Sequence, residues 1–186
     1  MVSNTSTTEP SRELTGCLST VCALGRPCVP SWGPVTADIM FVFTSPGFRD
    51  LEQLRPLAGP SGRVFDQLLS AAGLKRTEVF MAYTIACADF EREDRRPLPS
   101  ELELCQSRLF FDIHTVKPKV IVAMGNLAIA NFFPSTTVSK MRGKIRNWRG
   151  TPVVATYDPA FAAPHMSPQV VPLIVDDILT AKSLII

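Results

Sequence analysis

A chain of 186 residues, 46% hydrophobic and 19% charged, is long enough for one domain with a substantial core and too short for two. This composition excludes a disordered protein, and no apolar run approaches the roughly 20 residues that would span a bilayer. A net charge of +2 is too weak to imply nucleic-acid binding by itself.

The N-terminus has neither a charged segment nor an apolar segment of the kind that directs secretion, so we expect an intracellular protein, cytoplasmic or nucleoid-associated. Five cysteines in such a chain argue against a disulfide framework. They are left as metal ligands or as plain buried thiols.

Short apolar strands alternate with helices along the chain. Residues 1–15 are expected to be a flexible tail, and residues 16–186 a single domain. Strands are predicted at residues 38–43, 78–85, 120–124 and 151–156, and helices at 61–72, 100–116 and 169–186, with another helix after Gly125. Continuous β-branched runs such as Val120–Met124 are typical of strands buried on both faces. The order predicts an α/β fold, a three-layer α/β/α sandwich around a four-stranded parallel sheet.

Several fragments occur in an order and spacing that resemble a known family. They are Cys22-x-Leu24-x-Arg26, Pro46-Gly47, Gly59-x-Ser61-Gly62, Arg95-x-Pro97 with Glu101 and Cys105, Pro118-Lys-Val-Ile-Val with Gly125, Arg142-Gly143 and Thr156-Tyr-Asp-Pro-Ala160. Together they resemble the uracil-DNA glycosylase superfamily, in particular its iron–sulfur branch, often called family 4. The resemblance runs from about Cys17 to the last helix. It implies that the protein flips a base out of DNA and hydrolyses its N-glycosidic bond.

The chain departs from the family's pattern at four positions of the pocket. Thr44 stands where the family has an acidic residue that handles the attacking water, and Asp158 stands at the position of a His. Leu57 corresponds to a Phe that stacks on the base, and Tyr83 to an Asn that reads the uracil edge. These departures predict that the target is a modified or damaged base and not plain uracil. An unusual pyrimidine is one candidate for that base. The alternative is an inactive module that binds DNA or protein.

Catalysis is assigned to Asp158, Thr44 and Ser45. A glycosylase stabilises an oxocarbenium-like sugar and positions water, and a carboxylate such as Asp158 can do both. Thr44 and Ser45 could hold the water through their hydroxyls. An ordinary Asp-Pro turn is the alternative interpretation of Asp158.

Base binding is assigned to four residues, which are Tyr83, Leu57, Phe48 and Asp89. Tyr83 could stack on a flipped base or enclose it, and its hydroxyl offers a donor and an acceptor. The alternatives are that Tyr83 is an aromatic residue of the core and that Asp89 belongs to a solvated charged loop.

The resemblance places four ligands of a [4Fe–4S] cluster at Cys17, Cys22, Cys87 and Cys105. The first pair is spaced more widely than in the family, so Cys28 could replace either member. The cluster would be structural, attaching the charged loop at residues 86–99 to the N-terminal segment. Buried thiols without a cluster are the alternative.

DNA contact is expected from a basic segment with five cations in ten residues, from Lys140 to Arg149. Arg142, Lys144, Arg146 and Arg149 are its candidates for phosphate contact, and a solvated loop is the alternative. In the superfamily a wedge residue enters the duplex from the loop that here holds His165 and Met166. Partners are therefore expected to be DNA, with neither a membrane nor an obligate protein partner.

Overall fold

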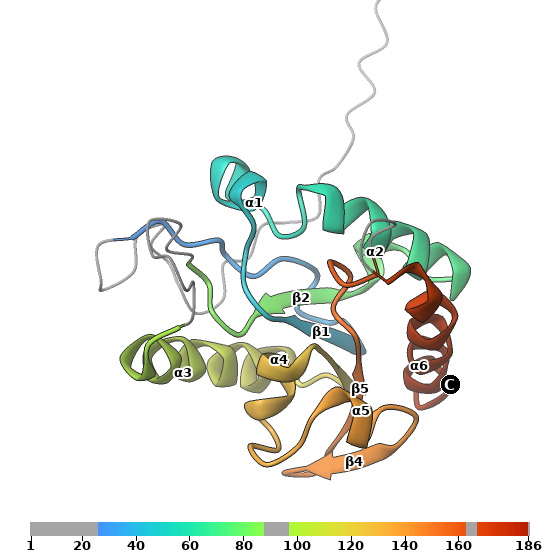
Figure 1. Ribbon diagram of the computed structural model, residues 1–186. Helices are drawn as coiled ribbons and strands as arrows, with labels where there is room; N and C mark the ends of the chain where they lie inside the picture. Colours follow the sequence, from blue (N-terminus) through green and yellow to red (C-terminus); the bar gives the residue numbers. More distant parts are fainter. Residues whose placement is uncertain (1–25, 88–96, 163–166, 186) are drawn as a thin grey trace, which may run out of the picture.

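The computed structural model describes residues 26–87, 97–162 and 167–185 (Figure 1). Within these ranges the chain forms a five-stranded sheet in the order β2-β1-β3-β5-β4. Four strands are parallel: β1 (Ile39–Phe43), β2 (Phe80–Tyr83), β3 (Val120–Met124) and β5 (Thr151–Thr156). The fifth strand, β4 (Ile145–Trp148), pairs antiparallel with β5 at one edge.

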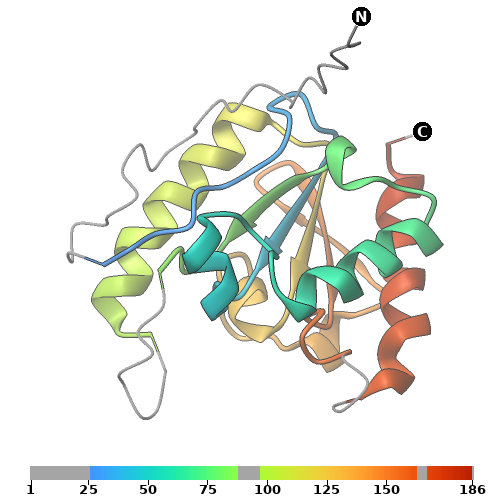
Figure 2. The same ribbon diagram turned by 90° about the horizontal axis from the view of Figure 1, so that it is seen from above.

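Helices cover both faces of the sheet (Figures 1 and 2). α2 (Pro60–Ala71) and α6 (Val171–Ser183) lie on one face, and α3 (Pro99–Val116) and α4 (Asn126–Ala130) on the other. The short α1 (Phe48–Gln53) follows β1, and α5 (Val138–Met141) precedes β4. Single 3-10 turns lie at Arg76–Glu78 and Pro168–Val170.

Strand alternation builds a separate core on each face. Phe41 and Phe43 of β1 pack toward α2, where Phe65 contacts both rings edge-on at centroid distances of 5.0 and 5.1 Å. Met40 and Val42 point to the opposite face, in the cluster that contains residues of α3 and α4. The three-layer α/β prediction is therefore confirmed.

The predicted number of strands was four, and the described residues contain five. The additional strand, β4, lies in the segment that the sequence suggested was a basic loop. Its side chains are mostly exposed, and Arg146 and Asn147 interrupt any apolar pattern. Charged side chains are typical of edge strands, because they discourage pairing with another chain. The strand was therefore missed, because its sequence has no apolar pattern.

The parallel register brings the carboxyl ends of four strands to one edge of the sheet. Phe43 is paired with Tyr83, and Met124 with Thr156. The residues that follow these ends, among them Thr44 and Gly125, therefore meet at that edge, where open α/β sheets bind ligands. Among the described residues, no helix has the length and apolar character needed to cross a membrane.

Candidate active site

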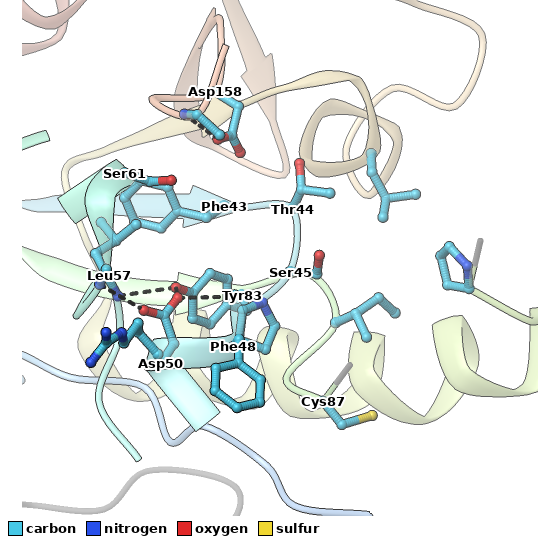
Figure 3. A pocket seen from close by; sticks show the side chains of 18 of the residues that line it. Phe43, Thr44, Ser45, Phe48, Asp50, Leu57, Ser61, Tyr83, Cys87 and Asp158 are labelled. Atoms are coloured by element: carbon cyan, nitrogen blue, oxygen red, sulfur yellow. Dashed lines mark hydrogen bonds between the residues drawn. The ribbon is translucent and has the colours of Figure 1, made fainter. Parts of the chain in front are cut away.

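A pocket of about 470 Å³ opens at the carboxyl edge of the sheet (Figure 3). Its walls come from the loop after β1, from α1, from the Leu57–Ser61 segment, and from the ends of β2 and β5. Its lining includes Thr44, Ser45, Phe48, Leu57, Tyr83 and Asp158, six of the residues expected to form the site. An ion pair between Arg26 and Glu101 borders the same pocket.

Asp158 and Thr44 lie in the loops that follow β5 and β1, and both approach Gly125. The carboxylate of Asp158 accepts a hydrogen bond from the backbone N–H of Ala160 at 2.9 Å, and it also interacts with the backbone and hydroxyl of Thr44. Gly125 has φ +93°, and a Cβ there would lie 2.9 Å from Thr44 Oγ1 and 3.5 Å from Asp158 Cβ. Only glycine permits this close approach.

The environment of Asp158 changes its acidity. Its side chain is half-buried at the pocket, and burial raises the pKa of the carboxyl above its usual range. Hydrogen bonds from Ala160 and Thr44 offset part of that rise. A carboxylate whose pKa lies closer to neutrality is a better general base, because it binds a proton more readily while still ionising.

Asp50, which the sequence did not suggest, is a buried carboxylate of the pocket lining that accepts four hydrogen bonds. It is 5% exposed, and its oxygens accept hydrogen bonds from the N–H groups of Gly47 (3.0 Å), Ala58 (2.7 Å) and Gly59 (3.3 Å) and from the hydroxyl of Tyr83 (2.7 Å). Asp50 is the third residue of α1, and its side chain accepts the N–H of the N-cap residue Gly47, which has no side chain to complete a capping box.

Tyr83 is buried at the end of β2, and both its hydroxyl and its backbone carbonyl form hydrogen bonds. Its hydroxyl donates to Asp50 and accepts a hydrogen bond from the N–H of Leu57 at 3.1 Å. Its carbonyl accepts a hydrogen bond from the guanidinium of Arg108, which also pairs with buried Asp112 at 3.3 Å. Burial, with the charge of Asp50, raises the pKa of Tyr83 well above its usual range, so the phenol stays neutral. Its hydroxyl is already used inside the protein.

The remaining residues expected in the pocket, for base binding and, in the case of Ser45, for catalysis, lie at different depths. Leu57 is 6% exposed and lines the pocket with a left-handed backbone (φ 54°). Phe48 also lines the pocket, but its ring is 63% exposed. Ser45 is exposed in the same lining. Asp89 lies outside the described residues.

Three cysteines lie close together beside the pocket. Cys28, Cys87 and Cys105 are free, buried thiols in one cluster with Ile85 and Ala86, and the backbones of Cys28 and Cys87 form an antiparallel β-bridge. A hydrogen bond between the side chains of Cys105 and Cys87, together with burial, raises the pKa of the Cys105 thiol.

The other two expected ligands, Cys17 and Cys22, lie outside the described residues. Within the part of the chain that the structure describes, no group of three His, Cys, Asp or Glu residues has an arrangement that could hold a metal ion. The fold nevertheless places two of the expected ligands, Cys87 and Cys105, side by side. This fits a site that a second pair of thiolates would complete.

The residues of the basic segment differ in their contacts, although the sequence suggested that all of them bind phosphate. Arg142 is partly buried, and its guanidinium bonds the carbonyl of Leu173 (3.2 Å) and pairs with Asp177 (3.4 Å). Arg146 lies over Phe133, and Arg149 over Trp148 at 4.9 Å.

The direction of β4 separates these cations. Because β4 is antiparallel, its last residue, Trp148, pairs with Thr151 at the amino end of β5. Arg149 therefore lies toward the sheet edge opposite the pocket. Lys144 stands before β4, and its ammonium bonds the carbonyl of Lys140 at 3.2 Å. His165 and Met166 lie outside the described residues.

Comparison with known proteins tests the family resemblance. Residues 30–177 match the Uracil DNA glycosylase superfamily. A Type-4 uracil-DNA glycosylase of Thermotoga maritima is 31% identical over 156 residues, which cover 82% of this chain and 80% of that protein. A Type-4 uracil-DNA glycosylase of Archaeoglobus fulgidus is 32% identical over 71% of this chain and 70% of its own. A Type-5 uracil-DNA glycosylase of Pyrobaculum aerophilum is 27% identical over 73% and 66%. The sequence-based resemblance is thus confirmed, and the chain belongs to the uracil-DNA glycosylase superfamily.

Proposed function

We propose that this protein is a DNA glycosylase, which hydrolyses the N-glycosidic bond of a base flipped out of DNA. Membership of the family supports a hydrolase of this bond, and the names of its relatives agree. The observation that carries the proposal is the half-buried carboxylate of Asp158, aligned by Thr44 and Gly125 in a pocket at the carboxyl edge of the sheet. An intracellular setting, with DNA as partner, is part of this proposal.

The chemistry that we assign to the pocket needs one carboxylate and one water. As the glycosidic bond weakens, the base departs with the bonding electron pair and positive charge develops on the sugar. The Asp158 carboxylate stabilises that charge and takes a proton from the water whose oxygen bonds to C1′. Thr44 keeps the carboxylate in place, and its hydroxyl, with that of Ser45, is available to hold the water.

We further propose that the preferred base is modified or damaged, and is not plain uracil. Among the described residues that line the pocket, none has a side-chain amide, the group that could pair with both a donor and an acceptor on the uracil edge. The hydroxyl of Tyr83 and the carboxylate of Asp50 bond each other and the backbone. Phe43, Leu57 and Ile85 supply apolar wall, so shape dominates the recognition of the base.

A panel of single-lesion DNA duplexes tests both parts of the proposal. Duplexes carrying uracil, 5-hydroxymethyluracil, 5-formyluracil, hypoxanthine or thymine glycol are incubated with excess protein, and the rate of base release is measured. We expect faster release of at least one modified base than of uracil. Efficient release of uracil alone would refute the preference for a modified base. A folded protein that binds these duplexes and releases no base would support the inactive binding module.

We propose that Cys17, Cys22, Cys87 and Cys105 hold a [4Fe–4S] cluster. The proximity of Cys87 and Cys105 supports this assignment, because a cluster requires thiolates that converge. The bound cluster would be structural and would attach the segment after Cys87 to the N-terminal segment. Cys28 is bridged to Cys87 through the backbone, lies in the same buried cluster, and is the alternative to Cys17 or Cys22.

Serine substitutions test the ligand set. In anaerobically purified protein, C87S and C105S are each expected to lose most of the iron and the broad visible absorption, because serine is a poor ligand for this cluster. C28S is the matched control, since Cys28 is equally buried and lies in the same cluster of side chains. Iron loss in C28S with iron retained in C22S would make Cys28 the ligand. Wild-type protein without iron would contradict the assignment.

DNA contact by the basic segment stays a prediction, and it now concerns fewer residues than the sequence suggested. We propose Lys144 as a phosphate contact, since it is an exposed positive charge just before β4, at the end of that strand nearer the pocket. Arg142 instead supports the segment through Asp177 on α6. For Arg149, stacking on Trp148 at the far edge favours a structural role over contact with the flipped base's strand.

A further inference from the structure

We propose that Asp50, Tyr83 and Arg76 form a positioning clamp that fixes the pocket wall at residues 56–59 against the flipped base. This inference rests on the proposed glycosylase function, because its effect is on the rate of base release. Asp50 and Tyr83 are buried and accept hydrogen bonds from the N–H groups of that wall (Figure 3), whereas Arg76 donates to its carbonyl groups. These three residues act on the reaction indirectly, by holding the backbone of residues 56–59 in place.

The wall requires such support because its backbone is strained. Leu57 adopts φ 54°, a left-handed conformation that residues with a branched side chain rarely occupy. Strained residues persist only where the surrounding structure fixes them, and they are concentrated at functional sites. Leu57 lines the pocket, and the family resemblance assigns its position to packing against the base.

The N–H groups of the wall are held by the Asp50 side of the clamp. Tyr83 accepts the N–H of Leu57, and one carboxylate oxygen of Asp50 accepts the N–H groups of Ala58 and Gly59. The other oxygen bonds Tyr83 and the N–H of Gly47. A single carboxylate therefore ties the wall to the loop that carries Thr44 and Ser45.

The carbonyl groups of the wall are held by Arg76. Its guanidinium donates to the carbonyls of Pro56 (3.3 Å) and Leu57 (3.2 Å), and also to Gly62 at the start of α2 (3.2 Å). Asp66 holds the guanidinium in place at 2.8 Å. With donors fixed on one side and acceptors on the other, the wall has little freedom to move away from the base.

A carboxylate is needed at residue 50 because all four of its partners donate. Asn retains one acceptor oxygen but introduces an NH₂ group, which has no acceptor function. In D50N, whichever way the amide is turned, NH₂ faces either the N–H groups of Ala58 and Gly59 or that of Gly47. Y83F removes the hydroxyl alone, and leaves the N–H of Leu57 without its acceptor.

The experiment compares D50N, Y83F and the double variant with two controls. I174A removes buried volume from α6 outside the pocket lining, and D38N removes an exposed carboxylate that pairs with Lys119. Three quantities are measured for each protein. They are the single-turnover release rate on the panel duplex that wild type cleaves fastest, the affinity for a duplex with a tetrahydrofuran abasic analogue, and the hydrogen exchange of individual backbone amides by NMR.

We expect D50N to release the base about 10²-fold more slowly, as expected when reacting groups are displaced by about 1 Å. Y83F should be roughly tenfold slower, and the double variant no slower than D50N, because both residues act through one bonded unit. Duplex affinity should stay at the wild-type value. Exchange at Gly47, Ala58 and Gly59 should accelerate in D50N, whereas I174A and D38N should keep both the rate and this local protection.

A D50N protein with the wild-type rate, or an I174A protein slowed as much as D50N at equal loss of stability, would overturn the clamp. If wild type releases no base from any duplex, the proposed function fails, and the exchange data still decide the clamp. In that case, accelerated exchange confined to Gly47, Ala58 and Gly59 in D50N supports it, and unchanged exchange there refutes it.

Discussion

Replacing Asp158 by Asn is expected to slow base release by about 10²- to 10⁴-fold, the usual contribution of a positioned general base. The amide keeps the size of the side chain and can still accept the N–H of Ala160. It cannot take a proton from water, and it carries no charge to stabilise the developing cation. Single-turnover rates on the duplex that the wild-type protein cleaves best measure the loss. Retention of the wild-type rate in D158N would remove Asp158 from the chemistry.

The raised pKa of Asp158 also predicts how the rate depends on pH. Because the ionised form acts as the base, the wild-type rate should increase as pH rises through the raised pKa and then level off. D158N should show a low rate without that increase. An identical rise in both proteins would assign it to another group.

The same pKa shift predicts an opposite effect on stability. A carboxyl whose folded-state pKa is raised contributes stability that is present below its unfolded-state pKa and is lost as pH rises through the folded-state pKa. D158N does not ionise, so its Tm should exceed that of wild type near neutral pH and approach it at acid pH. A less active and more stable variant is the expected signature of a functional carboxylate held in a partly dry site.

Replacing Gly125 by Ala is expected to slow base release by about 10²-fold, as much as D50N. The new methyl group would lie 2.9 Å from Thr44 Oγ1, so the hydroxyl that contacts Asp158 must move, whereas the 3.5 Å distance to Asp158 Cβ is an ordinary contact. The positive φ of +93° adds backbone strain of order 1–3 kcal/mol to the free energy of folding.

Gly150 offers a matched control for this substitution. It also has φ +93°, but nothing lies within 4 Å of the position that its Cβ would take. G150A should therefore lose stability through strain while keeping the rate of base release. Equal rates in G125A and G150A would show that the close approach of Thr44 and Asp158 is not needed for activity.

The parallel strands and their functional ends could be predicted because each depends on local sequence. Val120–Met124 is apolar throughout, and the observed β3 has the same bounds. Asp158 was found from its place after a predicted strand, and it does lie in the pocket. The short α1 was missed because six residues are too few to show an amphipathic period.

Asp50 could not be predicted as a member of the site, since what defines it is contact over distance. Its partners lie three, eight, nine and 33 residues away, and three of the four are backbone N–H groups, which leave no trace in a sequence. The position of Arg149 was equally inaccessible. It depends on the antiparallel direction of β4, which a segment without an apolar pattern does not reveal.

The bonding between Tyr83 and Asp50 limits how the base preference of this protein could be altered. Exchanging Tyr83 for an amide would remove the acceptor of the Leu57 N–H and one donor to Asp50 at the same time. An engineered change of preference would therefore have to redesign both residues together. A variant with only one of the two residues replaced is expected to release the base more slowly than the wild-type protein. Selection that acts on one substitution at a time would therefore keep the present pair.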